Sequence, residues 1–215
     1  MSRDCQYSIK LINRLRALDT DRLINFGQVN KAINWAIKYH GEQKRKSGEP
    51  YYTHPLEVAH IVSKYNPKTN VIVAAILHDI VEDTEVTFCM VFHSFGQRTA
   101  DMVNRLTRYR PDGTKWSVEK MLDNAYAHQD HEVLLIKVAD RLHNMQTLGA
   151  MSAAKQNRIA METLQEITAC ATNIEIHKEL VLLAAKIIKP DLCSTFDKIY
   201  SKIPSYRSFR LPFLR

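Results

Sequence analysis

A cluster of ionisable side chains stands directly behind an apolar segment in the first half of the chain. The run Val71–Leu77 is wholly apolar, and the residues after it include His78, Asp79, Glu82 and Asp83. If the segment continues as a helix, these four side chains share an arc of about 140°. Carboxylates beside an apolar wall are costly unless a cation neutralises them, and imidazole mixed with carboxylate suits Mn²⁺ or Fe²⁺. The spacing therefore predicts a divalent metal site.

Two further segments supply side chains of the same kind. His54 stands in "YYTHP", where Pro55 occupies a favoured first-turn position of a helix. Asp140 interrupts the apolar face of "IKVADRLHNMQTL", where an unpaired buried carboxylate would be costly. Together with His78 and Asp79 they would make four ligands and leave room for water and substrate, as catalytic sites do. The alternative is a solvated helix end that carries a fortuitous His-Asp pair.

The elements that must position these side chains are expected to be helices. The chain has 215 residues, 45% of them hydrophobic and only six of them glycine, and its apolar residues recur at helical spacing. The segment "EVLLIKVAD" could be a buried strand, but Leu142, Met145 and Leu148 continue it at helical spacing. The sequence thus predicts an all-α fold. The helical patterns run over 7–18, 28–40, 55–65, 69–83, 87–95, 98–107, 116–129, 131–148, 155–189 and 191–201.

The expected domain organisation is one helical domain over residues 1–195, followed by a basic and aromatic tail over 196–215. Residues 198–215 contain five cations and no acid, so they hold most of the net charge of +7. A nucleic-acid-binding surface is therefore not expected on the domain itself. The tail could pack against its own domain, or it could dock on a partner, an acidic surface or RNA.

Composition excludes several classes of protein. The longest uninterrupted apolar run, Val71–Leu77, is far short of a membrane span. The opening residues "MSRDCQYSIK" lack the apolar core of a signal peptide, so a cytoplasmic location is expected. The four cysteines are scattered without paired spacing, and we expect reduced thiols rather than disulfides or a zinc site. No feature of the sequence indicates an oligomeric state.

Three motifs in order give the chain a family resemblance. "HGEQKRKSGEPYYTHP", "LHDIVEDT" and "KVADRLHNMQTL" closely resemble the hydrolase domain of the RelA/SpoT homologues, within the HD phosphohydrolase superfamily, over about residues 25–150. The resemblance implies a compact multi-helix HD-domain bundle that binds Mn²⁺. It also implies removal of the 3′-pyrophosphate from the alarmones ppGpp and pppGpp, giving GDP or GTP plus pyrophosphate. By the same resemblance the metal ligands are His54, His78, Asp79 and Asp140.

The resemblance also assigns a catalytic role to the acidic pair Glu82 and Asp83. The reaction uses a metal-activated water, because a bound cation lowers the pKa of water by many units. One turn from the ligands, the two carboxyl groups could orient that water or exchange protons with it. Repulsion between them would raise the pKa of one of them, as a proton shuttle requires. The alternative is a solvated helix end.

The substrate contacts follow from the loop "KRKSGEP" and from the last motif. A nucleotide with four or five negative charges needs a cationic clamp, and the family uses Arg45 and Lys46 in this way. Asn144 lies one turn after Asp140 and could bond a ribose hydroxyl, and Thr147 could line the same wall. A solubilising loop and a threonine at the edge of the core are the alternatives. His143 is interpreted as a packed histidine.

The chain departs from the family in two places. In "METLQEITACATNIEIHKEL" an ungapped comparison puts Ile167 where the family has a tyrosine that lines the nucleotide pocket, so the base selectivity could differ. Long family members also continue into a synthetase domain, for which a chain of 215 residues is too short, so synthesis is not expected.

Three functions follow from these observations. The leading hypothesis is a Mn²⁺-dependent guanosine-3′,5′-bis(diphosphate) 3′-pyrophosphohydrolase with ppGpp and pppGpp as small-molecule substrates, favoured by the "RKSGEP" loop. The second is another HD phosphohydrolase that acts on a nucleotide such as NADPH or a deoxynucleotide, favoured by Ile167. The third is a non-catalytic alarmone-binding regulatory module, against which the complete ligand set and acidic pair argue.

Overall fold

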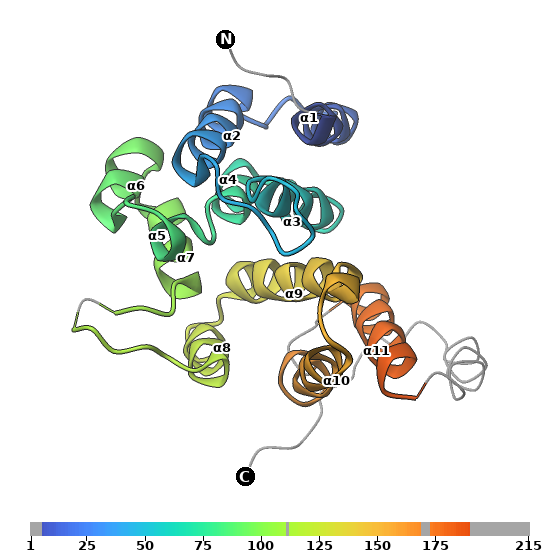
Figure 1. The fold of residues 1–215 in the computed structure, drawn as a ribbon. Helices are drawn as coiled ribbons and strands as arrows, with labels where there is room; N and C mark the ends of the chain where they lie inside the picture. Colours follow the sequence, from blue (N-terminus) through green and yellow to red (C-terminus); the bar gives the residue numbers. More distant parts are fainter. Residues whose placement is uncertain (1–5, 111, 169–172, 190–215) are drawn as a thin grey trace. The chain divides into compact units, whose positions relative to one another are not determined.

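The computed structural model describes residues 6–110, 112–168 and 173–189 (Figure 1). Every regular element within these residues is helical, which confirms the predicted all-α fold. The chain divides into two compact units, residues 1–143 and 144–215. The predicted boundary near residue 195 and the basic tail lie outside the described residues, so the domain organisation stays a prediction.

Helix α4 is the centre of the first unit. Its residues Val71–Ile76 are all buried, and α4 packs against α2, α3 and α7. A helix that is buried on every side has a continuous apolar sequence without helical periodicity. Periodicity alone therefore does not identify this segment as a helix. The helices of this unit before α9 are α1 (Gln6–Leu18), α2 (Phe26–His40), α3 (Thr53–Ser63), α4 (Thr69–Ile76), α5 (Ile80–Asp83), α6 (Phe88–Phe95), α7 (Gln97–Leu106) and α8 (Val118–Ala127).

The predicted helix over 69–83 is interrupted, which corrects the expectation that its polar residues share one helical arc. Residues 77–79 form a turn between α4 and α5. The side chain of His78 donates from Nδ1 to the backbone carbonyl of Ala75 (2.8 Å), the acceptor that a continuing helix would offer to the N–H of Asp79. Glu82 and Asp83 then donate their N–H groups to the carbonyl of Asp79 and begin the next helix.

Helix α9 (His131–Gln146) confirms the helical interpretation of "EVLLIKVAD". Its start is anchored by Asp130, a buried carboxylate that accepts from the N–H of Val133 and pairs with the guanidinium of Arg98 at 2.7 and 2.9 Å. Arg98 holds the pKa of Asp130 below its ordinary value against the effect of burial. This paired anchor fixes the helix that carries Asp140.

Two loops of the first unit each close with a single antiparallel bridge. The loop over residues 41–52 is pinned by the bridge between Lys44 and Pro50, and the loop over residues 107–117 by the bridge between Tyr109 and Lys115. Both loops contain several cations, and both contact residues of α5.

In the second unit α10 (Ala153–Glu162), the π-helical η2 (Thr163–Ile167) and α11 (Ile174–Ile188) pack together after the short η1 (Leu148–Ala150). The single helix predicted over 155–189 is therefore wrong in part. Hydroxyl groups of Thr163 and Thr168 donate to backbone carbonyls four residues back, and the side chain of Asn173 caps a new helix. The helix predicted over 191–201 lies outside the described residues.

Among the helices that the structure describes, none combines the length and the apolar character needed to cross a membrane.

Candidate metal centre

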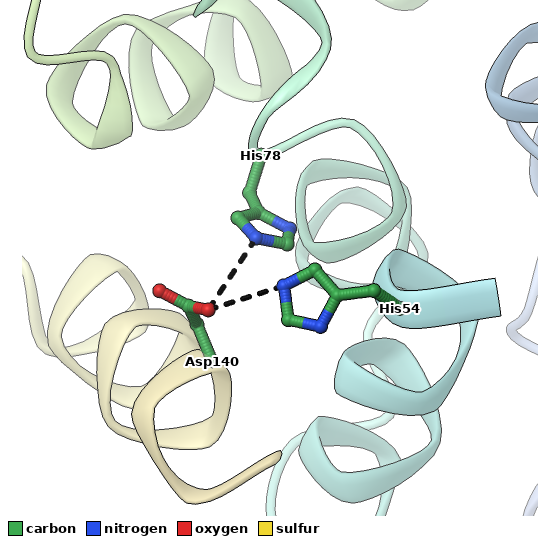
Figure 2. Close-up of side chains that lie close together, drawn as sticks. All are labelled: His54, His78 and Asp140. Atoms are coloured by element: carbon green, nitrogen blue, oxygen red, sulfur yellow. Dashed lines mark ion pairs between the residues drawn. The ribbon is translucent and has the colours of Figure 1, made fainter. Parts of the chain in front are cut away.

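Two histidines and an aspartate from three separate segments meet inside the first unit (Figure 2). Nε2 of His54, at the start of α3, lies 3.2 Å from Oδ1 of Asp140 on α9. Nε2 of His78, in the turn after α4, lies 3.9 Å from the same oxygen. One ligand atom from each residue lies within 4.8 Å of the others, and all three residues are buried. The group could hold a metal ion.

The fourth predicted ligand borders the same group. Oδ2 of Asp79 lies 3.0 Å from Nε2 of His78 and 3.7 Å from Nε2 of His54. Two imidazole nitrogens and two carboxylate oxygens form a donor set that suits a divalent transition metal. The structure thus brings the four predicted ligands together, while their ligation of a metal stays a prediction.

The ring of His78 is oriented as a metal ligand requires. Nδ1–H donates to the carbonyl of Ala75, which leaves Nε2 as the nitrogen that faces the carboxylates. That Nε2 is buried and makes no hydrogen bond of acceptable geometry, although the carboxylate of Asp79 is 3.0 Å away. A buried polar atom without a hydrogen bond is costly, and a cation at this position would satisfy it. The residues present therefore fit a bound divalent metal.

The ring of His54 is held by a second histidine. Its Nδ1 lies 2.7 Å from Nδ1 of His143, and a guanidinium nitrogen of Arg45 lies 3.4 Å from the same His143 atom. Because the guanidinium can only donate, Nδ1 of His143 accepts, and His54 donates Nδ1–H to it. Burial, together with the nearby His54 and Arg45, lowers the pKa of His143 to about 3 and keeps that ring neutral. His54 therefore presents Nε2 to Asp140.

The charges of the cluster show what neutralises the carboxylates when no cation is bound. Burial disfavours the charged form of His78, but the negative charges of Asp79 and Asp140 outweigh it and raise the pKa of His78 to about 9. Burial opposes ionisation of Asp140 as well, yet Lys137 and the histidines hold its pKa well below the ordinary value. Lys137 lies 2.7 Å from Oδ2 of Asp140, so Oδ1 is the oxygen that faces the histidines.

This proton on His78 predicts a pH-dependent metal affinity. Binding at Nε2 must displace the proton, so the Mn²⁺ affinity of the metal-free protein should rise by up to about tenfold per pH unit until pH reaches about 9. The raised pKa also stabilises the metal-free fold below pH 6.5, a contribution that is lost as pH rises through about 9. Titration calorimetry in buffers of different ionisation enthalpy counts the released proton. An affinity independent of pH, without proton release, would contradict this prediction.

The two members of the acidic pair have different surroundings. Asp83 accepts a hydrogen bond from the hydroxyl of Tyr51 at 2.7 Å, and burial, followed by Asp79 and Glu82, raises its pKa. Glu82 instead turns to the loop over residues 107–117, where its Oε2 accepts from the N–H of Arg108 (3.1 Å) and its Oε1 lies 3.6 Å from Nζ of Lys115. Burial is the largest cause of the raised pKa of Asp83, ahead of the repulsion between the two acids from which a raised pKa was predicted.

The four predicted substrate residues belong to different parts of the structure and differ in exposure. Arg45 is half-buried and reaches the cluster through His143, whereas Lys46 is exposed on the same loop. Asn144 and Thr147 belong to the second unit, where the carbonyl of Asn144 accepts from the N–H and the hydroxyl of Thr147. The substrate roles of all four stay predictions.

Ile167 is the residue expected where the family has a pocket tyrosine. It is fully buried, at the end of η2 in the second unit. A buried isoleucine contributes to the core of that unit, and the effect on nucleotide selectivity stays a prediction.

Sequence reasoning missed two residues that contact the possible metal ligands, Tyr51 and His143. His143 was interpreted as a packed histidine, yet it contacts His54 at 2.7 Å. Its position three residues after Asp140 on one helix was a signal that could have indicated the contact. Tyr51 stands three residues before His54, but the spacing gives no indication that its hydroxyl reaches two carboxylates.

Comparison with known proteins places the chain in a family. Residues 32–167 match the family model described as "HD domain". The match covers more than half of the chain, and the chain belongs to the HD domain family. The family-level resemblance predicted from the three motifs is thereby confirmed.

Curated relatives carry two kinds of name. A protein of Brucella ovis named "GTP pyrophosphokinase rsh" is 36% identical over 190 residues, which are 85% of this chain and 25% of the relative. A Synechocystis protein named "Probable guanosine-3′,5′-bis(diphosphate) 3′-pyrophosphohydrolase" is 36% identical over 84% of this chain and 24% of its own. A Myxococcus xanthus "GTP pyrophosphokinase" is 40% identical over 75% of this chain and 23% of its own. The chain thus spans about a quarter of the length of these relatives.

A solved structure shares the fold. It is described as a metazoan orthologue of SpoT that hydrolyses ppGpp, and it superposes with a TM-score of 0.63 over 73% of this chain and 93% of its own. Its sequence identity is 24%, so the comparison supports the all-α HD-domain architecture.

Proposed function

We propose that the protein is a metal-dependent 3′-pyrophosphohydrolase of guanosine alarmones, converting ppGpp and pppGpp to GDP and GTP plus pyrophosphate. The observation that carries the proposal is the buried cluster of His54, His78 and Asp140, bordered by Asp79, in a chain of the HD domain family. Relatives named for this hydrolysis support the same substrate class.

The four clustered side chains would hold the cation in this mechanism. His54 and His78 would offer their Nε2 atoms, because their Nδ1 atoms are engaged with His143 and Ala75. Asp140 would offer Oδ1, because Lys137 occupies its other oxygen. A bound divalent cation supplies Lewis acidity, which lowers the pKa of water and polarises a phosphoryl oxygen. We propose Mn²⁺ as the bound cation, because a site of mixed imidazole and carboxylate donors suits this ion better than a site of thiolate donors does.

The chain's own acids would handle the proton. Hydrolysis transfers one proton from the attacking water and delivers one to the leaving oxygen. Asp83, with its raised pKa, is suited to take the first proton near neutral pH. Glu82 would orient the water, because its carboxylate is held by Arg108 and Lys115.

Arg45 would bind the polyphosphate. Its guanidinium is half-buried beside His143 and therefore lies close to the metal ligand His54. A planar guanidinium binds phosphate oxygens in pairs and keeps its charge at any physiological pH. Lys46, on the exposed side of the same loop, would add a second positive charge.

The test is incubation of the purified protein with ppGpp in the presence of Mn²⁺ or EDTA, followed by ion-exchange chromatography. Mn²⁺-dependent formation of GDP and pyrophosphate is the expected result. Parallel reactions with Mg²⁺ and Zn²⁺ test the metal, and reactions with NADPH and deoxynucleotides test the alternative that the buried Ile167 raises. Bound metal without cleavage of any of these nucleotides would overturn the proposal in favour of a binding module.

A further inference from the structure

The hydroxyl group of Tyr51 lies between two carboxylates of the site. It is 3.0 Å from Oδ2 of Asp79 and 2.7 Å from Oδ2 of Asp83. Asp79 borders the cluster of possible metal ligands, whereas Asp83 belongs to the acidic pair. One side chain from the loop over residues 41–52 therefore connects the residue proposed to hold the cation with the residue proposed to accept the proton.

Packing fixes the ring of Tyr51. The ring of His40, at the end of α2, lies against it with centroids 4.7 Å apart and an angle of 30°. The ring of His54 meets it edge-on at 6.1 Å and 80°. Two aromatic neighbours and half-burial leave the ring of Tyr51 little rotational freedom, so the hydroxyl is held near one position.

Gln43 fixes the backbone of both partners. Its carbonyl accepts from the N–H of Tyr51 at 2.8 Å, while its side-chain amide donates to the backbone carbonyl of Asp83 at 2.8 Å. The oxygen of the same amide accepts from Nδ1 of His40 at 3.0 Å. Gln43 thus holds the backbone of Tyr51 in the loop and the backbone of Asp83 in α5. Both backbones are fixed relative to each other, which favours the short hydrogen bond between the two side chains.

The hydroxyl has one proton and faces two carboxylate oxygens. It can donate to Asp79 or to Asp83, but not fully to both, so one contact places two electron-rich oxygens about 3 Å apart. The conflict is relieved when a cation neutralises Asp79, because the hydroxyl can then donate to Asp83. Cation binding at one carboxylate would in this way set the orientation of the other.

We propose that Tyr51 is a positioning residue that couples metal binding at Asp79 to the orientation of Asp83. The role of Asp83 rests on the proposed function, whereas the contact with Asp79 does not. Tyr51 neither touches the substrate nor exchanges a proton with it. Its hydroxyl aligns the carboxylate of Asp83 for the attacking water and restrains the carboxylate of Asp79 for the cation.

The variant Tyr51→Phe removes only the hydroxyl and keeps the ring that packs on His40 and His54. We expect kcat for ppGpp to fall about 10- to 100-fold at saturating Mn²⁺, with KM changed by less than about twofold. We also expect the Mn²⁺ affinity of the metal-free protein to fall on the order of tenfold in titration calorimetry. The matched control is Tyr39→Phe, which removes the hydroxyl of a half-buried tyrosine of α2 whose ring packs edge-on against Trp35.

A double-mutant cycle with Asp83→Asn separates positioning from a general structural effect. If Tyr51 acts through Asp83, Tyr51→Phe should lower kcat much less in the Asp83→Asn background than in the wild type. Equal losses in both backgrounds, or an equal loss in Tyr39→Phe, would overturn the proposal. So would wild-type Mn²⁺ affinity and kcat in Tyr51→Phe. If the wild type cleaves no alarmone, the proposed function fails while the Mn²⁺ affinities of Tyr51→Phe and Tyr39→Phe still decide whether Tyr51 restrains Asp79.

Discussion

Asp79→Ala should lose Mn²⁺ binding and, with it, at least about 10³-fold of the rate of ppGpp cleavage, roughly 4 kcal/mol of barrier. Asp79 is the carboxylate nearest to the otherwise unsatisfied Nε2 of His78, at 3.0 Å. Its removal leaves two histidines and Asp140, a set with too little negative charge to hold a divalent cation at its former affinity. Titration calorimetry with Mn²⁺ and the chromatographic assay measure the two losses.

Misfolding is separable from metal loss in this variant. His78 attracts Asp79 more strongly than Asp140 repels it, so the variant should lose some stability of the metal-free fold, and thermal unfolding without Mn²⁺ measures that loss separately from Mn²⁺ binding. The pKa of His78 should fall from about 9 toward its ordinary value once Asp79 is gone, and NMR titration of the ring can follow it. The control is Asp101→Ala on α7, where a half-buried carboxylate accepts from the side-chain amide of Gln97. Unchanged Mn²⁺ affinity in Asp79→Ala would remove Asp79 from the ligand set.

Most of the residue set of the cluster was predictable, because Asp140, His78 and Asp79 are ionisable residues within or next to apolar segments. Asp140 interrupts an apolar helix face, and His78 with Asp79 follows a fully buried helix. Buried charges at such positions require partners, so the sequence alone indicated that these side chains meet. The helical character of α9 was predictable for a related reason, since its apolar spacing continues past the ambiguous segment.

The local geometry was not predictable, because side chains there replace backbone hydrogen bonds. The break at residues 77–79 depends on the ring of His78 taking the carbonyl of Ala75. In η2, similarly, the hydroxyl group of Thr168 donates to the carbonyl of Leu164, while the N–H of Thr168 donates to the carbonyl of Thr163. Periodicity reports which residues are apolar, and it is insensitive to this competition between side chain and backbone.

The acidic pair shows how distant contacts separate residues of the same chemistry. Glu82 and Asp83 are adjacent, and the sequence offers no reason to assign them different roles. Their partners come from opposite directions along the chain: Tyr51 precedes Asp83 by 32 residues, and Arg108 follows Glu82 by 26. Only the folded chain brings a hydroxyl to Asp83 and a cationic loop to Glu82. The acid with the raised pKa therefore had to be identified from the structure.

Glu82→Gln should keep Mn²⁺ and lose about 10²- to 10⁴-fold of ppGpp turnover, the range for a residue that exchanges or directs a proton. The side chain of Glu82 points to Arg108 and Lys115, so its loss leaves the four possible ligands in place. The amide oxygen of glutamine can still accept from the N–H of Arg108, which preserves the local fold. It cannot hold a water as strongly as a carboxylate does.

Two further variants identify the cause of that loss. Glu85→Gln makes the same chemical change at an exposed acid three residues further along and should leave turnover and Mn²⁺ affinity unchanged. Lys115→Met removes the cation 3.6 Å from Glu82 but keeps the carboxylate, so turnover should fall far less than in Glu82→Gln if the carboxylate itself acts on the water. A loss of Mn²⁺ affinity in Glu82→Gln as large as in Asp79→Ala would instead make Glu82 a ligand. Full turnover would leave the chemistry to Asp83 alone.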